Sequence, residues 1–429
     1  MKIKPGYKQT EVGVIPEDWE VKALASLTER IMVGIASAAT HAYRAKGVPM
    51  FRNQNIKSGY LADVDLLFLD PEFEKTFSNK RLRSDDLLTA RTGYPGTTCV
   101  VPLLYESAQS FTTLITRPNT TVVDSSFLCH YINSEEGQKF FEQGQIGGAQ
   151  KNINAGTLRT MPVPLPPLPE QRAIAEALGD VVALLGGLDR LIAKKRDIKQ
   201  AAMQQLLTGQ TRLPGFRGEW EVKRLGELFN FSGGYSASRD QLSTEGHCYL
   251  HYGDIHGSTK TCIDADADFQ EIPKLDIPLK RVSSASLLDD GDVVFVDASE
   301  DDAGTSKHVV VVNKNKKPFI SGLHTIVAKG RTEELAHDYR RFCFQTPAIR
   351  QQFLFYSVGT KVSGISKSNI PKVTLSFPSV PEQTAIAEVL TDMDTELAGL
   401  EQRREKTRAL KQAMMQELLT GRTRLTIIP

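Results

Sequence analysis

The sequence predicts an α+β protein in which two similar domains alternate with two copies of one long helix. The first observation behind this prediction is an internal repeat. Residues 169–213 and residues 381–425 align without a gap at an offset of 212, and 26 of the 45 aligned positions are identical. The second observation is that short apolar strands and short helical stretches alternate in the segment before each copy.

The chain is therefore expected to have four parts. They are a first domain (residues 1–168), a central helix (169–212), a second domain (213–380) and a distal helix (381–429). The only two tryptophans, Trp19 and Trp220, stand in the same Trp-Glu-Val-Lys run near the start of each domain.

The two domains share little further sequence, but weak correspondences survive. Residues 50–56 parallel 249–255, and residues 86–91 parallel 292–297; each is a predicted strand beside a turn. Residues 124–142 and 333–355 are predicted to be helical. These correspondences predict one α+β fold for both domains.

Each repeated segment has apolar residues at alternating steps of four and three, which is the seam of a coiled coil. The seam positions are Ile174, Leu178, Val181, Leu185, Leu188 and Ile192 in the first copy, and Ile386, Leu390, Met393, Leu397 and Leu400 in the second. Gly209 and Gly421, each after Leu-Leu-Thr, are expected to end the helices. About 40 helical residues would form a rod of roughly 60 Å.

A single helix of that length would leave its seam in water. Each copy could pack on its own domain or on another chain, or the two copies could pair with each other. A gapless repeat within one chain favours an antiparallel coiled coil of the two copies. Such a pair has pseudo-twofold symmetry and would place the two domains at opposite ends.

The composition is that of a globular protein, with 40% apolar and 24% charged residues. No apolar run approaches the roughly 20 residues of a membrane span. The five cysteines are scattered, which is typical of a reducing, cytoplasmic protein. The net charge of +1 counts against a nucleic-acid binder unless the positive charge is local or partner proteins supply it.

Several catalytic signatures are absent. The sequence contains no Gly-x-x-x-x-Gly-Lys-Ser/Thr phosphate loop and no Asn/Asp-Pro-Pro-aromatic tetrapeptide, which an amino-methyltransferase needs. His247 and His251 lie close together, as do Asp264, Asp266 and Asp268, but neither set has the spacing of metal ligands. We therefore predict no catalytic residue, no metal site and no cofactor in this chain.

Two unlike domains, each followed by the same long helix, resemble the specificity subunit of type I restriction–modification enzymes. Residues 6–19 are similar to the opening of that family, residues 164–171 to its entry into the central helix, and residues 201–209 and 418–421 to its helix exits. The resemblance covers the whole chain. The second helix entry departs from the pattern, because residues 377–381 lack the double proline.

The resemblance implies that each domain is a target-recognition domain that reads one half of a split site in double-stranded DNA. It also implies two methyltransferase subunits docked on the helices, which bring S-adenosylmethionine and methylate adenine N6. Two translocase–nuclease subunits would add cleavage driven by ATP and requiring Mg²⁺. The chain itself would be a non-enzymatic, DNA-binding subunit.

Base reading requires donors and acceptors that reach into the groove, namely Arg or Lys for guanine and Asn or Gln for adenine. Candidates in the first domain are Arg44, Arg52, Asn53, Gln54, Arg91, Tyr94, Gln150, Lys151 and Asn152. Candidates in the second are Tyr235, Arg239, His251, Tyr252, Lys361, Ser363 and Lys367. The alternative function is a coiled-coil adaptor whose two domains bind proteins instead of DNA, and the near-neutral charge is its main support.

Overall fold

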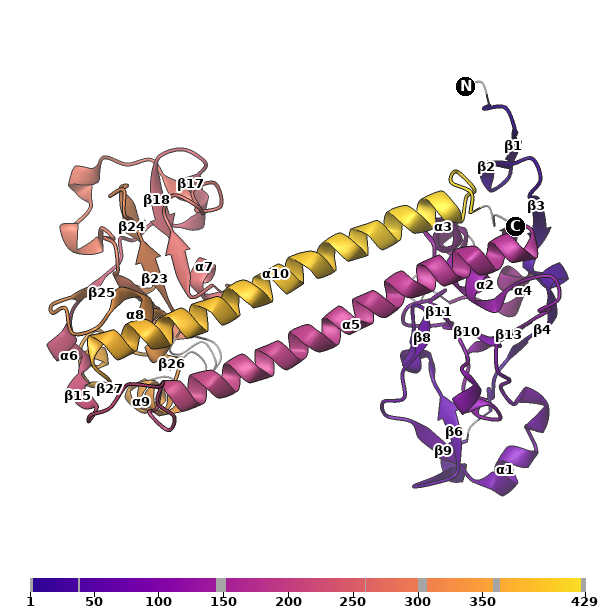
Figure 1. The fold of residues 1–429 in the computed structure, drawn as a ribbon, viewed down its shortest axis with the longest axis horizontal. Coiled ribbons are helices and arrows are strands. Elements are labelled where there is room, and N and C mark those ends of the chain that lie inside the picture. Colours follow the sequence, from indigo (N-terminus) through magenta and orange to yellow (C-terminus); the bar gives the residue numbers. More distant parts are fainter. Residues whose placement is uncertain are drawn as a thin grey trace. The chain divides into compact units, whose positions relative to one another are not determined.

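The structure is a computed structural model that describes residues 3–37, 39–143, 152–258, 260–299, 307–357 and 363–425. The chain divides into two compact units, labelled by element in Figure 1. The first unit comprises Met1–Arg190 and Gln402–Pro429, and the second comprises Leu191–Glu401. The long helices α5 (Leu168–Leu206) and α10 (Val380–Leu418) each begin in one unit and end in the other.

The first unit is built on two four-stranded sheets, with strand orders β11-β10-β13-β4 and β12-β6-β9-β5. The strands of the two sheets are β4 (Thr28–Val33), β5 (Tyr43–Arg44), β6 (Val48–Phe51), β9 (Leu67–Leu69), β10 (Leu87–Thr89), β11 (Thr98–Val100), β12 (Gln109–Ser110) and β13 (Leu114–Pro118). Small two-stranded sheets are formed by β1 (Tyr7–Thr10) with β2 (Gly13–Pro16), β3 (Glu20–Ala23) with β14 (Pro162–Leu165), and β7 (Ile56–Lys57) with β8 (Tyr60–Leu61). The shorter helices are α1 (Pro71–Lys75), α2 (Ser125–Ile132), α3 (Glu135–Gln143) and α4 (Ala155–Arg159).

The second unit repeats this plan, with strand orders β16-β25-β21-β23-β19 and β17-β20-β18-β24. The strands of these sheets are β16 (Phe229–Gly233), β17 (Leu242–Ser243), β18 (His247–Leu250), β19 (Cys262–Asp264), β20 (Lys274–Leu275), β21 (Val293–Val296), β23 (His308–Val312), β24 (Phe319–Ser321) and β25 (Thr325–Gly330). Small sheets pair β15 (Glu221–Arg224) with β27 (Thr374–Phe377), and β22 (Ala298–Ser299) with β26 (Ser363–Gly364). The shorter helices are α6 (Leu225–Leu228), α7 (Tyr252–His256), α8 (His337–Cys343) and α9 (Pro347–Tyr356).

The two units therefore share one α+β fold, as the sequence predicts. In the first unit β6 pairs in parallel with β12, and in the second β18 pairs in parallel with β24. The predicted helical stretches 124–142 and 333–355 each contain two helices, α2 with α3 and α8 with α9. In the second stretch the sequence explains why a new helix begins after α8, since Thr346 caps α9 and Pro347 occupies its first turn.

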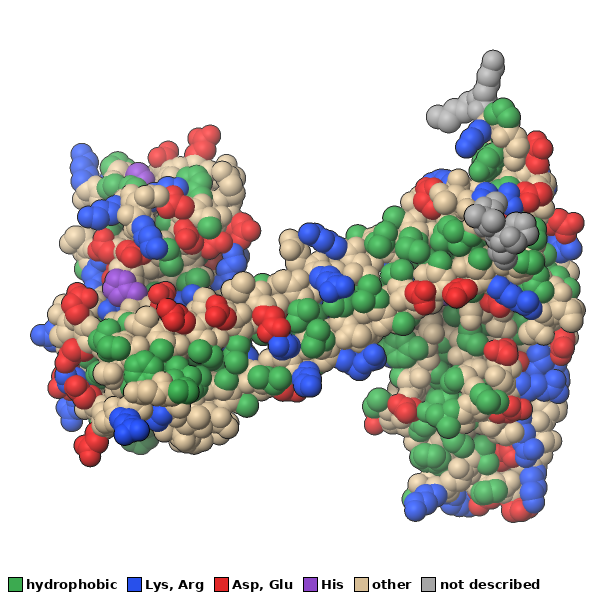
Figure 2. All heavy atoms as spheres, in the orientation of Figure 1, with side chains coloured by type: hydrophobic (Ala, Val, Ile, Leu, Met, Phe, Trp, Pro, Cys, Tyr) green, Lys and Arg blue, Asp and Glu red, His purple; other side chains and the backbone are tan. Residues whose placement is uncertain are grey.

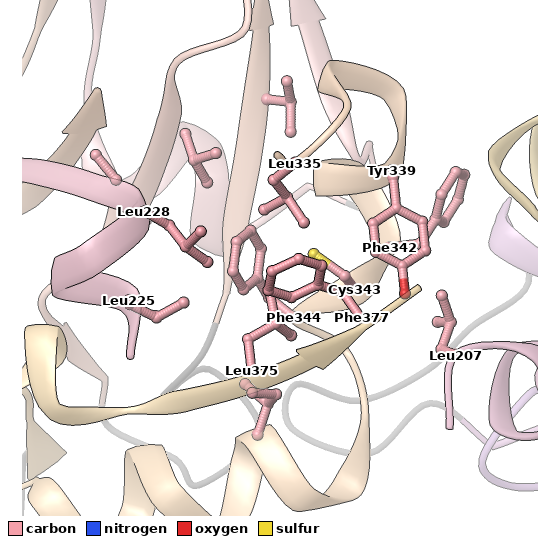
Figure 3. Close-up of a cluster of buried hydrophobic side chains, with 14 of the residues drawn as sticks. Leu207, Leu225, Leu228, Leu335, Tyr339, Phe342, Cys343, Phe344, Leu375 and Phe377 are labelled. Carbon is pink, nitrogen blue, oxygen red and sulfur yellow. The ribbon is translucent and has the colours of Figure 1, made fainter. Parts of the chain in front are cut away.

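The long helices pack directly onto the core of each unit. In the second unit, Leu207 at the end of α5 and Ile386 and Leu390 near the start of α10 join the buried side chains of α8 and β27. Figure 3 shows this cluster, in which Tyr339, Phe342 and Phe344 are labelled beside Leu375 and Phe377. The helices are thus part of each domain's core.

The two helices pair antiparallel within each unit. In the second unit, the Lys195 ammonium of α5 lies 2.7 Å from Glu396 Oε1 of α10, and Lys199 pairs with Asp394. In the first unit, Arg404 of α10 lies 3.5 Å from Asp189 of α5. The predicted seam is confirmed. Ile174, Leu178, Leu188 and Ile192 of α5 and Ile386, Leu390 and Leu397 of α10 are buried, and Val181, Leu185, Met393 and Leu400 are partly buried.

A four-residue contact, here called the closing node, joins the exit of one helix copy to the entry of the other. Its members are Trp19, Glu170, Gly421 and Arg424 in the first unit, and Trp220, Glu382, Gly209 and Arg212 in the second. The helix-copy members stand 212 positions apart in the sequence. The repeat therefore encodes the same arginine–glutamate pair and the same arginine–tryptophan contact in both units.

In the first unit, Arg424 Nε donates to Glu170 Oε1 at 2.7 Å, and the guanidinium lies over the Trp19 ring. The indole N–H of Trp19 donates to Glu170 Oε2 at 3.2 Å. Gly421 has a φ of +70°, and a Cβ there would come within 2.4 Å of the Pro16 ring. The predicted glycine stop thus has a second role, because it lets the helix end lie against the opening segment of the chain.

Each repeated segment begins with the residues Pro-Glu-Gln, at 169–171 and at 381–383, and the glutamine has a specific role. Gln171 accepts a hydrogen bond from the Asp124 amide at 2.8 Å and donates to the Pro166 carbonyl at 2.9 Å. Gln383 repeats both contacts with the Ala336 amide and the Pro378 carbonyl, each at 2.8 Å. Each glutamine therefore fixes the helix entry to the strand and helix that precede it.

Candidate nucleic-acid interface

In each unit a glycine lets two backbone segments approach closely. A Cβ on Gly34 would lie 2.4 Å from the Ser110 carbonyl oxygen, and a Cβ on Gly234 would lie 1.8 Å from that of Gly322. The next residue in each case donates its amide across the gap, Ile35 to Ser110 and Tyr235 to Ser321, both at 2.7 Å. The same backbone arrangement, a glycine followed by an amide hydrogen bond, therefore lies beside the parallel strand pair in both units.

The polar residues after β6 and β18 are held by matching caps. The Arg52 amide donates to Asn55 Oδ1 at 2.9 Å, and the His251 amide donates to Asp254 Oδ2 at 3.2 Å. These caps make residues 53–55 a single 3₁₀ turn and residues 252–256 the short helix α7. The turn predicted beside each strand is thus a corner held by a side-chain cap in both domains.

Two further segments meet each corner, and we call the resulting group the strand-end cluster. It contains Arg52, Asn53, Arg91 and Thr112 in the first unit, and His251, Tyr252, Asp297 and His324 in the second. Asn53 is its centre in the first unit. Its Oδ1 accepts from the Arg91 amide at 2.8 Å, and its Nδ2 donates to Thr112 Oγ1 at 3.3 Å.

In the second unit the same positions carry rings and a carboxylate. The His251 and Tyr252 rings lie 4.5 Å apart between centroids, and Tyr252 contacts His324 edge-on at 5.4 Å. Burial, with a smaller contribution from the Arg239 guanidinium, lowers the pKa of His251. A shared framework therefore presents different hydrogen-bonding groups in the two domains.

A hollow of about 780 Å³ lies over the first cluster and brings together four of the predicted residues, Arg52, Asn53, Gln54 and Tyr94. Lys57 and Thr112 also line it, and among the described residues no carboxylate does. Tyr94 is 81% exposed, so its ring is available to a ligand. In the second unit, Arg239 and His251 line a hollow of about 480 Å³ together with Asp254 and Lys274.

The other predicted residues lie in less favourable places. Arg44 pairs with Asp70 at 2.9 Å, and Tyr235 packs partly buried beside an apolar cluster. Asn152 and Lys367 are exposed. Gln150, Lys151 and Lys361 lie outside the described residues, as does the side chain of Ser363.

Sequence reasoning missed Thr112 and His324. Each stands alone in its segment with no motif around it, and the only signal is the offset of 212 that relates the two positions. Their place beside the corner residues depends on the parallel pairing of β12 with β6 and of β24 with β18, which the sequence does not reveal.

Charge is mixed on the visible surface of both units, where Figure 2 shows Lys and Arg side chains interspersed with Asp and Glu. Among the described residues, no three His, Cys, Asp or Glu side chains gather in a way that could hold a metal ion. Within the same residues, no helix is long and apolar enough to span a membrane. The five cysteines are free thiols.

Comparisons with a family model, with known relatives and with solved structures all lead to the same family. The model of the type I restriction modification DNA specificity domain matches the chain twice, at residues 16–192 and 217–408. A putative specificity subunit of the type I restriction enzyme MjaX from Methanocaldococcus jannaschii is 24% identical over 436 residues, or 98% of this chain and 97% of the relative. The EcoKI specificity subunit of Escherichia coli is 22% identical over 400 residues, or 87% of this chain and 82% of the relative.

The fold is similar to that of the S subunit of a type I restriction–modification system from M. genitalium. The TM-score is 0.58 at 13% identity, covering 97% of this chain and 98% of that chain. Because the family model matches most of the chain, the protein belongs to the family of type I restriction–modification DNA specificity proteins. Its function is recognition of a DNA target, and catalysis lies with partner subunits.

Proposed function

We propose that the two units read the two halves of a bipartite site in double-stranded DNA, each through its strand-end cluster and the hollow beside it. The observation that carries this proposal is one framework present twice with different side chains, Asn53 and Thr112 in one copy and Tyr252 and His324 in the other. A common backbone keeps the docking geometry, while the side chains decide which bases are accepted.

The partners follow from the same proposal. Two methyltransferase subunits dock on the helices and methylate adenine N6 with S-adenosylmethionine, and two translocase–nuclease subunits add ATP- and Mg²⁺-dependent restriction. The assembly acts in the cytoplasm, where its DNA substrate lies. Since the chain's net charge is only +1, much of the attraction to phosphate would come from these partners.

The experiment is to map N6-methyladenine across host DNA with and without this chain, in the presence of its methyltransferase. We expect a two-part motif that disappears when the chain is removed. Replacing residues 16–168 with the equivalent domain of a relative should change one half of the motif only. A change in both halves would contradict separate reading by the two units, and so would a motif that does not change.

The adaptor alternative has lost its support, because the family to which the chain belongs is defined by DNA specificity. Electrophoretic mobility shift with and without the co-expressed methyltransferase gives an independent readout. We expect specific binding of a DNA duplex that carries the mapped motif. Protein binding without any DNA binding would favour the adaptor.

A further inference from the structure

We propose that Thr112 and His324 are specificity-determining residues that contact bases, one in each half of the target. This inference rests on the proposed function. The two residues occupy the same place in the two units, between β12 and β13 and between β24 and β25. Each directly precedes a buried threonine, Thr113 or Thr325, whose hydroxyl bonds to a buried serine.

The backbone at both positions is left-handed, with φ of +53° at Thr112 and +57° at His324. Glycine adopts this conformation without cost, whereas a β-branched residue such as threonine does so only under strain. A turn that served only to connect two strands would be better made with glycine. The side chains present at these two positions therefore point to a role for the side chain itself.

Thr112 lies within the hydrogen-bonding groups of the first hollow. Its Oγ1 accepts a hydrogen bond from Asn53 Nδ2 at 3.3 Å, and it lines the hollow together with Arg52, Gln54 and Tyr94. Because the oxygen is already engaged as an acceptor, the hydroxyl proton is left to donate. Thr112 is thus suited to a base acceptor such as guanine O6 or thymine O4.

His324 is held by two neighbours, and its side chain remains 53% exposed. Its Nδ1 lies 3.3 Å from Asp297 Oδ1, a buried oxygen that forms no hydrogen bond among the described residues. The edge-on contact with Tyr252 fixes the plane of the imidazole. The tautomer that carries its proton on Nδ1, on the side of this carboxylate, presents Nε2 as an acceptor. That atom suits the exocyclic amino group of adenine or cytosine.

Glycine substitutions give a clean test, because glycine removes the side chain and tolerates the backbone conformation. We expect T112G to reduce discrimination at one base pair of the first half-site by about tenfold and to leave the second half-site unchanged. H324G should do the reverse. The readouts are the methylated motif in host DNA and competition binding with every single-base variant of that motif.

Matched controls are D85G and K316G, which place glycine at exposed left-handed positions outside the clusters, with φ of +68° and +51°. Both should leave the motif unchanged. H324N is a second variant, since asparagine tolerates the backbone and keeps an acceptor; we expect it to retain part of the discrimination. Co-purification with the methyltransferase and the melting temperature report folding.

Relaxation at a single base pair in the expected half would support the proposal. An unchanged motif in folded T112G and H324G would overturn it, and so would an equal loss in both halves. If H324G failed to fold, H324N would replace it in the test, and full wild-type discrimination in folded T112G and H324N would overturn the proposal. Failure of the proposed function itself is separate, because the wild-type chain would then direct no site-specific methylation.

Discussion

Gln54 lines the first hollow and is available to bind a ligand. Its side chain is exposed, and within the described residues its amide makes no hydrogen bond. The neighbouring Asn53, by contrast, already uses both amide atoms to hold Arg91 and Thr112. The two adjacent amides therefore have different roles, with Asn53 positioning the cluster and Gln54 available for an adenine edge.

We predict that Q54A relaxes one A·T pair of the first half-site by about 1–3 kcal/mol, the usual value of a bidentate amide–adenine contact. The second half-site should not change. Q9A, at an exposed position in β1, is the control. Competition binding with single-base variants measures the effect. Equal affinities of Q54A and wild-type protein for all variants would show that Gln54 reads no base.

His130 on α2 distinguishes the two units electrostatically. Burial, with a smaller contribution from the Lys411 ammonium, lowers the pKa of His130 to about 4. Its counterpart at the offset of 212 is Phe342, which lies beside Lys199 in the second unit. The first unit thus holds a titratable ring where the second holds an apolar one.

This difference gives a pH prediction. Between pH 6.5 and about 4 the unfolded chain binds a proton at His130 that the folded chain does not, so stability is lost as the pH falls through this window. The loss should reach about 3 kcal/mol at most. H130F should remove it, whereas wild-type and variant proteins should show similar pH dependence above pH 7. Melting temperatures measured from pH 7.5 to 4.5 test this; parallel curves for the two proteins would contradict it.

At the scale of the elements, the closing nodes show why the repeat is so strict. Glu170 and Glu382 are buried, and each needs the arginine from the exit of the other helix copy. The hydrogen bonds with Glu170 and Asp18 raise the pKa of Arg424. Loss of this arginine would leave a buried carboxylate without its charge partner.

We predict that R424A destabilises the first unit by about 2 kcal/mol, the usual cost of losing hydrogen bonds to a buried charge, and that R212A lowers the stability of the second unit for the same reason. R408A, which removes an exposed i,i+3 pair with Glu405 on α10, should change stability by less than about 0.5 kcal/mol. Thermal unfolding followed by calorimetry gives the comparison. Equal melting temperatures for R424A and R408A would mean that the node contributes no stability.

The sequence predicted the repeat, the seam and the glycine stops, because these depend on residues close together in the chain. It did not predict the node, since Trp19 and Arg424 are 405 positions apart and only the antiparallel pairing joins them. The same reason explains the candidate site. The corner at Arg52–Gln54 was recognised from its polar run after a strand, whereas Thr112 joins it only through the pairing of β12 with β6.

At the scale of the whole molecule, the chain passes from one compact unit to the other only twice. The crossings fall after Arg190 within α5 and after Glu401 within α10. Every contact of the strand-end clusters and the closing nodes lies inside one unit. Changing the helices at the crossings therefore leaves both reading sites and both closures intact.

We predict that the length of the two helices sets the spacing between the two half-sites. The division into two units allows a direct test of this prediction. Four residues are inserted after Arg190 and four after Glu401, so that the antiparallel pairing is preserved within each unit. Each insertion adds about 6 Å along its helix. Since four residues slightly exceed one turn of 3.6, the packed faces rotate by about 40° and can re-form.

Six ångströms correspond to about two base-pair steps of 3.4 Å. The accompanying rotation of the DNA groove opposes a perfect match, so we expect the unread spacer to lengthen by one or two base pairs. Both half-site sequences should stay the same, because no residue of either cluster is altered.

As a control, two-residue insertions at the same points rotate the faces by about 200° and should abolish methylation of the motif. Sequencing the methylated motif decides the matter. An unchanged spacer would mean that the helices only dock the partner subunits, and altered half-sites would mean that the helices themselves contact bases.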